Sequence, residues 1–286
     1  MRVPTRNWVL SRSWSAFTYL LLSVGLVIAT FPFIWMFVSS FKPNAEIYRI
    51  PITIFPQSAS LNNYQVLLSG ERIPFIRQFA NSVIITASRI VINLLACSAA
   101  AYAFAKYRFP LKNLLFLVVI GFLMIPPQIT VVPLFLLMNG FGWLDTLYAV
   151  ALPGAFTAFG VFFLRQVMVG SVPMEILESA RMDGASEYRT FFQLVLRLPA
   201  VSSGLIVLMT LTFVNTWNEY FWPVVALRSS EKFTLPVGLA TLVGMYRIEY
   251  GMLMAGGFMA VLPVILIFLI GRKTFIQGFT AGAVKG

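Results

Sequence analysis

Long uncharged, apolar stretches alternate with short charged segments along the whole chain. The clearest stretches lie between Arg12 and Lys42 and between Glu249 and Arg272, and neither contains a charged residue. A helix needs about 20 apolar residues to cross roughly 30 Å of hydrocarbon. The pattern therefore predicts helices that cross a membrane.

Six such crossings are expected. They lie near residues 16–39, 79–104, 113–137, 145–167, 200–224 and 250–271. Pro126, Pro127 and Pro133 predict a kink in the third crossing, which an outer turn over 138–144 follows. The apolar segment 233–246 is too short to cross, so we expect it at the membrane interface or re-entering the membrane.

Basic residues before the first crossing, namely Arg2, Arg6 and Arg12, resemble the start of a signal peptide. A signal peptide has an apolar region of only about 7–15 residues, followed by a small-residue cleavage site. The stretch after Arg12 is longer, and no such site follows it. We therefore expect an uncleaved membrane anchor.

Composition supports a lipid environment. Hydrophobic residues make up 59% of the 286 residues and charged residues 11%, whereas soluble domains carry about 25% charged residues. The sequence has no histidine, which excludes His-liganded zinc, haem held by His and Ser-His-Asp hydrolases. The one cysteine, Cys97, cannot form an intrachain disulfide and is expected to pack as a small apolar residue. No metal site is expected.

The distribution of positive charge predicts the orientation of the chain in the membrane. The net charge of +11 is spread between apolar stretches, which indicates membrane topology rather than a nucleic-acid-binding surface. Most Lys and Arg residues fall in segments 1–15, 105–112, 165–199 and 272–286. Positive residues favour the cytoplasm, so these segments are expected inside. The predicted fold is an all-α integral membrane protein, a six-helix transmembrane bundle with both termini in the cytoplasm.

The most polar inner segment is residues 171–199, between the fourth and fifth crossings. Ser171 is expected to cap a helix with Pro173 in its first turn. Asp183 and Gly184 then break the helix, and Ser186 can cap a second one. Two short helices predict a compact cytoplasmic lobe. In the alternative interpretation, the apolar residues of this lobe only cover the protein's own inner surface.

Specific residues in this lobe resemble a known motif. Glu178, Ser179 and Ala180, followed by Asp183, Gly184 and Ala185, are similar to the EAA loop of permease subunits in ABC importers. Leu194 and Leu196 continue the motif at its usual spacing. Ser179 replaces an alanine of the motif, and Arg197 stands where the motif has proline.

Further motifs resemble the permeases of carbohydrate importers, of the subunit type that includes the smaller permease of the maltose importer. They are Asn81–Ser82, Ala100–Ala103, Arg108–Pro110, Trp217–Glu219, Trp222–Pro223, Thr234–Gly238 and the tail Thr280–Gly286. The resemblance covers about residues 15–286. It implies the six-helix fold of type I ABC importer permeases and half of the translocation path for a sugar or oligosaccharide.

The same resemblance implies a set of partners. These are a second permease subunit, a dimer of cytoplasmic ATP-binding subunits, an extracytoplasmic solute-binding protein, the sugar itself and the lipid of a bacterial or archaeal cytoplasmic membrane. The chain lacks a GxxxxGK[ST] phosphate-binding loop. ATP and Mg are therefore expected in the partner ATPase, with no enzymatic activity and no cofactor in this chain.

Roles in the EAA loop and in the tail also follow from the resemblance. The loop would dock on an ATPase, where Glu178 pairs with a basic group and Ala180 allows close approach. Within the tail 272–286, Gly282, Lys285 and Gly286 would enter the ATPase interface as an extended strand. The alternative for the tail is a frayed chain end.

Two charges within the crossings, Arg89 and Glu219, are costly in lipid and need a cavity or a partner. Arg89 could contact a substrate, or it could pair structurally with Glu219 or a second permease. The cavity could be lined by the consecutive residues Trp217, Asn218, Glu219 and Tyr220. The rings of Trp217 and Tyr220 could stack on sugar rings. Anchoring at the membrane interface is the alternative for these aromatic residues.

The domain plan has a cytoplasmic N-terminus at 1–15, a permease domain at 16–271 and the tail. Outer segment 40–78 and the connection 225–249 are expected either to dock the binding protein or only to cap the crossings. Two rival functions stay open. One is an ion-driven secondary carrier, and the other is an ABC permease for a solute that is not a sugar.

Overall fold

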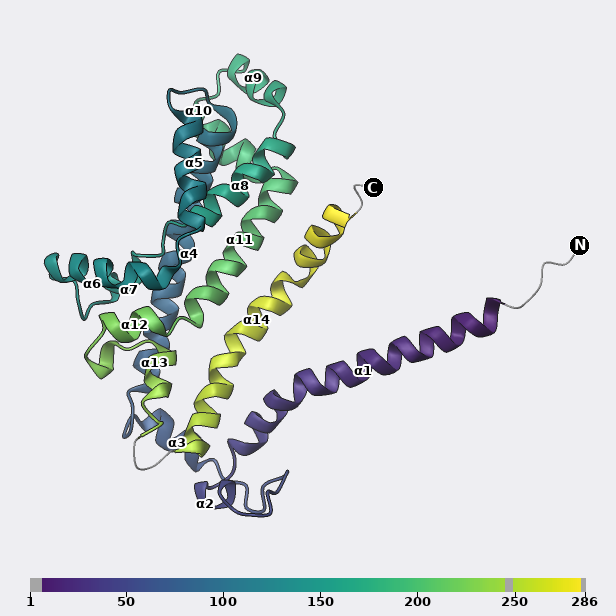
Figure 1. Cartoon of the computed structure of the whole chain (residues 1–286), viewed down its shortest axis with the longest axis vertical. Coiled ribbons are helices and arrows are strands. Elements are labelled where there is room, and N and C mark those ends of the chain that lie inside the picture. Colours follow the sequence, from purple (N-terminus) through teal and green to yellow (C-terminus); the bar gives the residue numbers. More distant parts are fainter. Residues whose placement is uncertain (1–6, 245–248, 284–286) are drawn as a thin grey trace, which may run out of the picture. The chain divides into compact units, whose positions relative to one another are not determined.

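The elements of the described residues are all helical (Figure 1). This computed structural model describes residues 7–244 and 249–283. The chain forms two units. The first unit holds Met1–Arg72 and Leu242–Met259, and the second holds Ile73–Thr241 and Ala260–Gly286.

The first unit contains α1 (Asn7–Ser39), α2 (Asn44–Ile47), α3 (Asn62–Ser69) and the start of α14 (Tyr250–Ala283). Within α1, residues Phe17–Ser39 are long and apolar enough to cross a membrane. Their large apolar side chains are exposed, which would be unfavourable in water and is favourable in lipid.

Polar contacts hold the loop after α1. Asn63 of α3 donates from its amide to the carbonyls of Ser40 and Lys42, at 2.8 Å each. Lys42 is itself buried, donates to the carbonyl of Thr53 and lies with its ammonium 4.7 Å from the centre of the Trp35 ring. These contacts satisfy backbone carbonyls of the loop that follows α1.

The second unit holds the other helices. They are α4 (Phe75–Lys106), α5 (Lys112–Leu123), α6 (Val131–Gly140), α7 (Leu147–Ala151), α8 (Ala158–Ser171), α9 (Met174–Met182), α10 (Glu187–Arg189), α11 (Pro199–Trp217), α12 (Phe221–Ala226), α13 (Leu235–Ala240) and the rest of α14. Helix α4 is central, because it packs against α8 and α11 and also contacts α7 and α13. In Figure 1, α9 and α10 lie at one end of this unit, and α12 and α13 lie toward the other.

A close approach between α4 and α8 forms the core of the second unit. Cys97 is fully buried there together with Val161, Leu164 and Met168. A Cβ atom on Gly160 would lie 2.8 Å from the sulfur of Cys97. Only glycine therefore lets the two helices pack at this distance, and the expectation that Cys97 packs as a small buried residue is confirmed.

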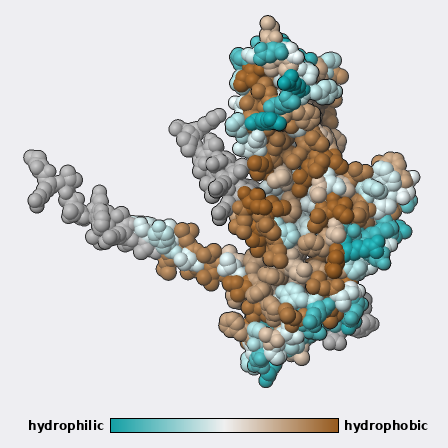
Figure 2. All heavy atoms as spheres, turned by 180° about the vertical axis from the view of Figure 1, so that it is seen from behind, coloured by the Kyte–Doolittle hydropathy of each residue, from teal (hydrophilic) through white to brown (hydrophobic). Residues whose placement is uncertain are grey.

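Apolar side chains also cover much of the outside of the second unit. Figure 2 shows brown apolar surface across its middle and teal polar residues at the end that carries α9 and α10. Exposed residues of this surface include Leu117, Phe122, Val132 and Leu136. A soluble protein would aggregate through such a surface, whereas lipid accommodates it.

Most predicted crossings correspond to helices. Phe17–Ser39, Phe75–Lys106, Pro199–Trp217 and Tyr250–Ile270 are each long and apolar enough to cross a membrane. The kink that the prolines predict in the third crossing is confirmed, because Lys112–Leu123 and Pro127–Gly140 are bent by 97°. Counting this bent pair as one crossing gives five, and a sixth is reached only when α8 is counted together with α9, from which it is bent by 79°.

The prediction of an unbroken fourth crossing over 145–167 is wrong. Helix α7 ends at Ala151, and α8 starts only at Ala158. Pro153 and Gly154 lie between them, where proline cannot continue the hydrogen-bonding pattern of a helix. The fifth crossing is likewise shorter than the predicted 200–224, because α11 ends at Trp217 and α12 forms separately. The segment 233–246 contains the short helix α13, whose Leu235 is buried.

Replacing Gly160 by valine should destabilise the second unit. The added side chain would overlap the Cys97 sulfur, and overpacking of this kind costs about 1–3 kcal/mol. We expect a lower melting temperature in detergent. Gly170→Val on the same helix is the matched control, because a Cβ atom there meets no atom within 4 Å. Equal melting temperatures for both variants would contradict the close packing.

Candidate functional site

The lobe between α8 and α11 begins with α9, which is bent by 79° from α8. Helix α9 starts after Pro173, which has no side-chain capping bond. The prediction that Ser171 caps this helix is wrong. Its hydroxyl instead donates back to the carbonyl of Val167 at 2.6 Å and so closes the end of α8.

The predicted break after α9 is confirmed. Gly184 has a φ of 74°, a conformation that residues with a side chain adopt only at a cost. The N–H of Ala185 donates to the carbonyl of Ala180 at 2.9 Å, which is a left-handed helix ending. Ser186 then caps α10 and accepts from the N–H of Arg189 at 3.3 Å, as predicted.

One side of α9 is anchored in the core of the second unit, and the other carries exposed side chains. Leu177 is 1% exposed and belongs to the core of the second unit. Glu178 and Ser179 are exposed, Ala180 is half-buried and Met182 is 88% exposed. The lobe thus covers the protein's own surface through Leu177, yet it leaves an acidic and apolar face uncovered.

Within the membrane region, the structure pairs Arg89 of α4 with Glu219 (7% and 27% side-chain exposure). The guanidinium of Arg89 also donates to the carbonyl of Val150 at 2.5 Å and to that of Ala151 at 3.3 Å. These carbonyls lie at the end of α7, where the break leaves backbone acceptors without helical partners. Arg89 therefore joins the break after α7 to the break after α11.

The other candidate cavity residues differ in exposure. Trp217 is 3% exposed, donates from its indole to the carbonyl of Ala260 at 3.0 Å and stacks on Phe213. Its expected roles, stacking on a sugar or anchoring at the interface, both need an open ring and are contradicted. Asn218 and Tyr220 are exposed, and Glu219 is half-buried. These three residues form the accessible part of the break after α11.

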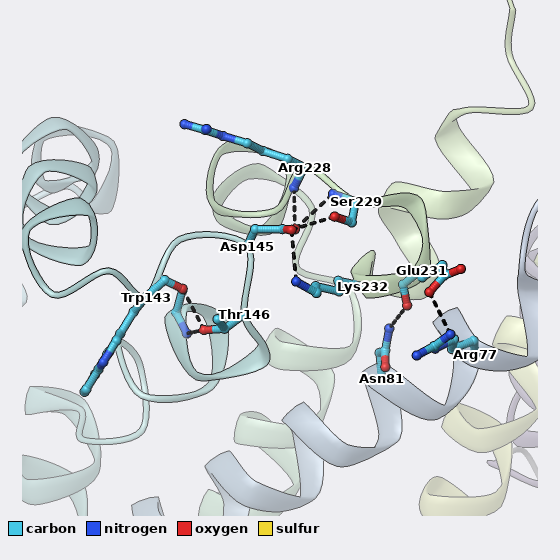
Figure 3. Close-up of polar contacts among 10 residues, drawn as sticks. Arg77, Asn81, Trp143, Asp145, Thr146, Arg228, Ser229, Glu231 and Lys232 are labelled. Atoms are coloured by element: carbon cyan, nitrogen blue, oxygen red, sulfur yellow. Dashed lines mark hydrogen bonds and ion pairs between the residues drawn. The ribbon is translucent and has the colours of Figure 1, made fainter.

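At the end of the second unit that lies away from α9, Asp145 joins the loop before α7 to the connection after α12 (Figure 3). Its carboxylate accepts from the N–H groups of Arg228 and Ser229 at 2.9 Å each and from the ammonium of Lys232 at 3.0 Å. Burial opposes its ionisation, but hydrogen bonds from Ser229, Arg228 and Lys232 hold the pKa of Asp145 well below its usual range. The sequence analysis used Asp145 only as the boundary of an uncharged stretch and missed this contact.

Two of the sequence motifs meet beside this contact. The Asn81 amide donates to the carbonyl of Glu231 at 2.8 Å (Figure 3) and to that of Phe233 at 3.1 Å. The Ser82 hydroxyl accepts from the N–H of Leu235 at 2.8 Å. The start of α4 thus orders the connection that leads into α13.

The described residues offer no group of three or more His, Cys, Asp or Glu side chains that could hold a metal ion. In the tail, α14 continues to Ala283, so Thr280–Ala283, with Gly282, is helical rather than the expected extended strand. Lys285 and Gly286 lie outside the described residues.

Removing the charge of Arg89 should destabilise the protein strongly. Arg89→Leu would leave Glu219 and two carbonyls without a donor, and breaking a buried pair in this way costs about 3–5 kcal/mol. Glu219→Gln should cost less because Glu219 is partly exposed. Melting temperatures in detergent would test this order. Equal values for wild type and Arg89→Leu would contradict a structural pair.

Replacing Asp145 by asparagine should loosen the connection over 227–233. The loss of charged hydrogen bonds is expected to cost about 1–2 kcal/mol at neutral pH. Because folding lowers this pKa, the contribution is full above the ordinary aspartate range near pH 4 and disappears as the pH falls through the folded value. Melting of both proteins at pH 7 and about pH 3 tests this: the difference should shrink in acid. A constant difference would show that the carboxylate charge is not the cause.

Comparison with known proteins adds the family context. Residues 92–273 match the family described as "Binding-protein-dependent transport system inner membrane component". The chain is 38% identical to the arabinooligosaccharides transport system permease protein AraQ of Halalkalibacterium halodurans, over 99% of this chain and 98% of that protein. It is 32% identical to the lactose transport system permease protein LacG of Rhizobium radiobacter, over 93% and 95% of the two chains.

A solved structure has the same fold. The similarity is to a chain in the crystal structure of a bacterial ABC transporter involved in the import of the acidic polysaccharide alginate. The TM-score is 0.82 at 23% identity, and the match covers 96% of this chain and 99% of that one.

Proposed function

This chain belongs to the family of inner membrane components of binding-protein-dependent transport systems, and from that membership we propose that it forms half of the translocation path of an ABC importer for an oligosaccharide. It is a multi-pass protein of the cytoplasmic membrane. Relatives named for arabinooligosaccharides, lactose and diacetylchitobiose support a sugar. Another relative is named for sn-glycerol-3-phosphate, so a phosphorylated solute is the alternative to a sugar as the substrate.

The uncovered face of α9 carries this proposal. Helix α9 is anchored by Leu177 and is terminated by the turn at Gly184. It presents Glu178 and Met182 to the outside, which suits docking into a cleft of a partner. ATP hydrolysis takes place in that partner, a cytoplasmic ATPase dimer, since this chain lacks a phosphate-binding loop. Movement of α9 then changes the side of the membrane to which the path between the two permeases is open.

The proposal of the remaining partners rests on the family membership. A second permease completes the path, and a solute-binding protein delivers the sugar from outside. A related structure is described as a bacterial alginate ABC transporter in complex with an alginate pentasaccharide-bound periplasmic protein, which supports such delivery. The outer segments 40–78 and 225–249 are the proposed docking surface.

The buried pair favours a neutral sugar over an anionic one. Arg89 is occupied by Glu219 and two backbone carbonyls and offers no free charge to an anion. The same pairing argues against an ion-driven carrier that uses Glu219, because such carriers bind and release their ion at an acid in the membrane.

Gly184→Asp should abolish coupling while the protein stays in the membrane. A side chain at this φ is strained, and a negative charge at the end of α9 opposes the helix dipole. We expect uptake of labelled arabinooligosaccharide to fall below about a tenth of wild type in cells that express the full transporter. Gly184→Asn is the control, because asparagine tolerates the left-handed conformation without charge, and it should keep more uptake. Normal uptake by Gly184→Asp would contradict the docking role.

A further inference from the structure

The end of α4 that lies beside the α9 lobe contacts the lobe at its entry and at its exit. At the entry, the ammonium of Lys106 donates to the carbonyl of Val172, between α8 and α9. At the exit, the ring of Tyr102 lies against Phe191, with centroids 5.3 Å apart. Phe191 is itself buried. These two contacts place the lobe on α4, but neither contact reaches α9 itself.

Glu187 makes the connection to α9. Its carboxylate accepts a hydrogen bond from the hydroxyl of Tyr107, the residue that follows α4. Its other oxygen accepts from the guanidinium of Arg181, in the last turn of α9, at 2.8 Å. The ring of Tyr107 is held in turn by Tyr102, edge to face, with centroids 5.4 Å apart. Glu187 therefore joins α9 to the end of α4 through two side chains.

The charges in this group reinforce each other. Arg181 first and Tyr107 second lower the pKa of Glu187 and outweigh the opposing effect of its partial burial. Glu187 in turn raises the pKa of Arg181. The carboxylate and the guanidinium are therefore both ionised across the physiological range, so both partners keep the charge that the link needs.

The other route out of the lobe is irregular. After α10 the chain forms a π-helix over Thr190–Leu194 and a 3₁₀ turn over Val195–Arg197 before α11 starts at Pro199. Such turns have poorer hydrogen bonds than an α-helix and often form hinges. A push on α9 is therefore transmitted less directly into α11 than into α4.

Helix α4 leads directly to the buried ion pair. It runs without a break from Phe75 to Lys106 and carries Arg89 near its middle. The rise of about 1.5 Å per residue puts Lys106 roughly 25 Å along the helix from Arg89. A displacement of the end of α4 therefore moves the residue that joins the breaks after α7 and α11.

We propose that Glu187 is a positioning residue for coupling: by holding Arg181 of α9 and Tyr107 beside α4, it makes α9 and α4 move as one body. This inference rests on the proposed function, because α9 must be the element that the ATPase moves. Glu187 touches neither solute nor nucleotide in this role. It acts by fixing the path along which the motion of α9 reaches Arg89.

The link contributes little to folding. Arg181 and Glu187 are 42% and 46% exposed, and ion pairs with such exposure contribute little to stability because water and salt screen them. Burial of Leu177 and Phe191 anchors the lobe without them. Loss of Glu187 should therefore leave an assembled transporter whose α9 moves independently of α4.

The test uses the full transporter in proteoliposomes, with its binding protein and arabinooligosaccharide. For Glu187→Ala we expect normal co-purification of the ATPase and an unchanged melting temperature. Uptake per ATP hydrolysed should fall about tenfold, because the variant loses both hydrogen bonds to the carboxylate, from Tyr107 and from Arg181. Tyr107→Phe keeps the ring contact and removes only the donor, so a smaller fall of about threefold is expected. Gln193→Ala is the matched control on the same lobe: it removes the 3.0 Å bond from Arg189 and should match wild type.

The double variant Tyr107→Phe/Glu187→Ala separates the link from two unrelated effects. If the link is the cause, the double variant transports like Glu187→Ala alone. Effects that multiply, or wild-type coupling by Glu187→Ala, would overturn the proposal. If the Glu187→Ala transporter does not assemble, uptake per ATP hydrolysed by Tyr107→Phe decides the question. A wild-type value for Tyr107→Phe then rejects the link. Uptake by the wild-type transporter without ATP would instead reject the proposed function.

Discussion

The fold depends on how a chain in lipid satisfies the backbone groups at its helix breaks. Hydrocarbon offers no hydrogen bonds, so a break within the membrane region needs a side chain to replace the missing helical partner. Arg89 does this for Val150 and Ala151, and Glu219 neutralises its charge. The pair thus satisfies backbone acceptors at the gap between α7 and α8 and also ties the segment after α11 to α4. The arrangement also explains why so costly a residue as arginine lies in an apolar helix.

Helix α4 contacts three regions of the second unit that are otherwise separate. Its start orders the connection after α12 through Asn81 and Ser82. Its middle holds the breaks through Arg89, and its end meets the α9 lobe through Lys106. A single uninterrupted helix is stiff along its axis, and the close packing at Gly160 couples it to α8. Transport by a subunit of this family requires motion on one side of the membrane to change access on the other, and α4 has the contacts for it.

The two ends of the second unit are built in different ways. At the Asp145 end, one carboxylate gathers several donors from a single short segment and keeps that segment in place. At the α9 end, Glu187 shares its carboxylate between two elements that differ in exposure and anchoring. The first pattern fixes a surface, whereas the second links α9 to the end of α4. Both carboxylates stay ionised because their hydrogen bonds lower their pKa values.

The sequence by itself determined the features that depend on composition and local chemistry. Uncharged stretches located most of the crossings, the prolines after Leu123 predicted the bend, and Gly184 predicted the end of α9. Residue types at fixed spacing were enough to indicate the family. The sequence did not show the break after Ala151, because a count of charges does not detect a proline and a glycine within an apolar stretch. Only the tertiary structure decided which partner Arg89 takes, that Trp217 is covered, and that Glu187 and Asp145 join segments far apart in the chain. These outcomes depend on which side chains the packing of α4 against α8 and α11 brings together, and no local pattern encodes that.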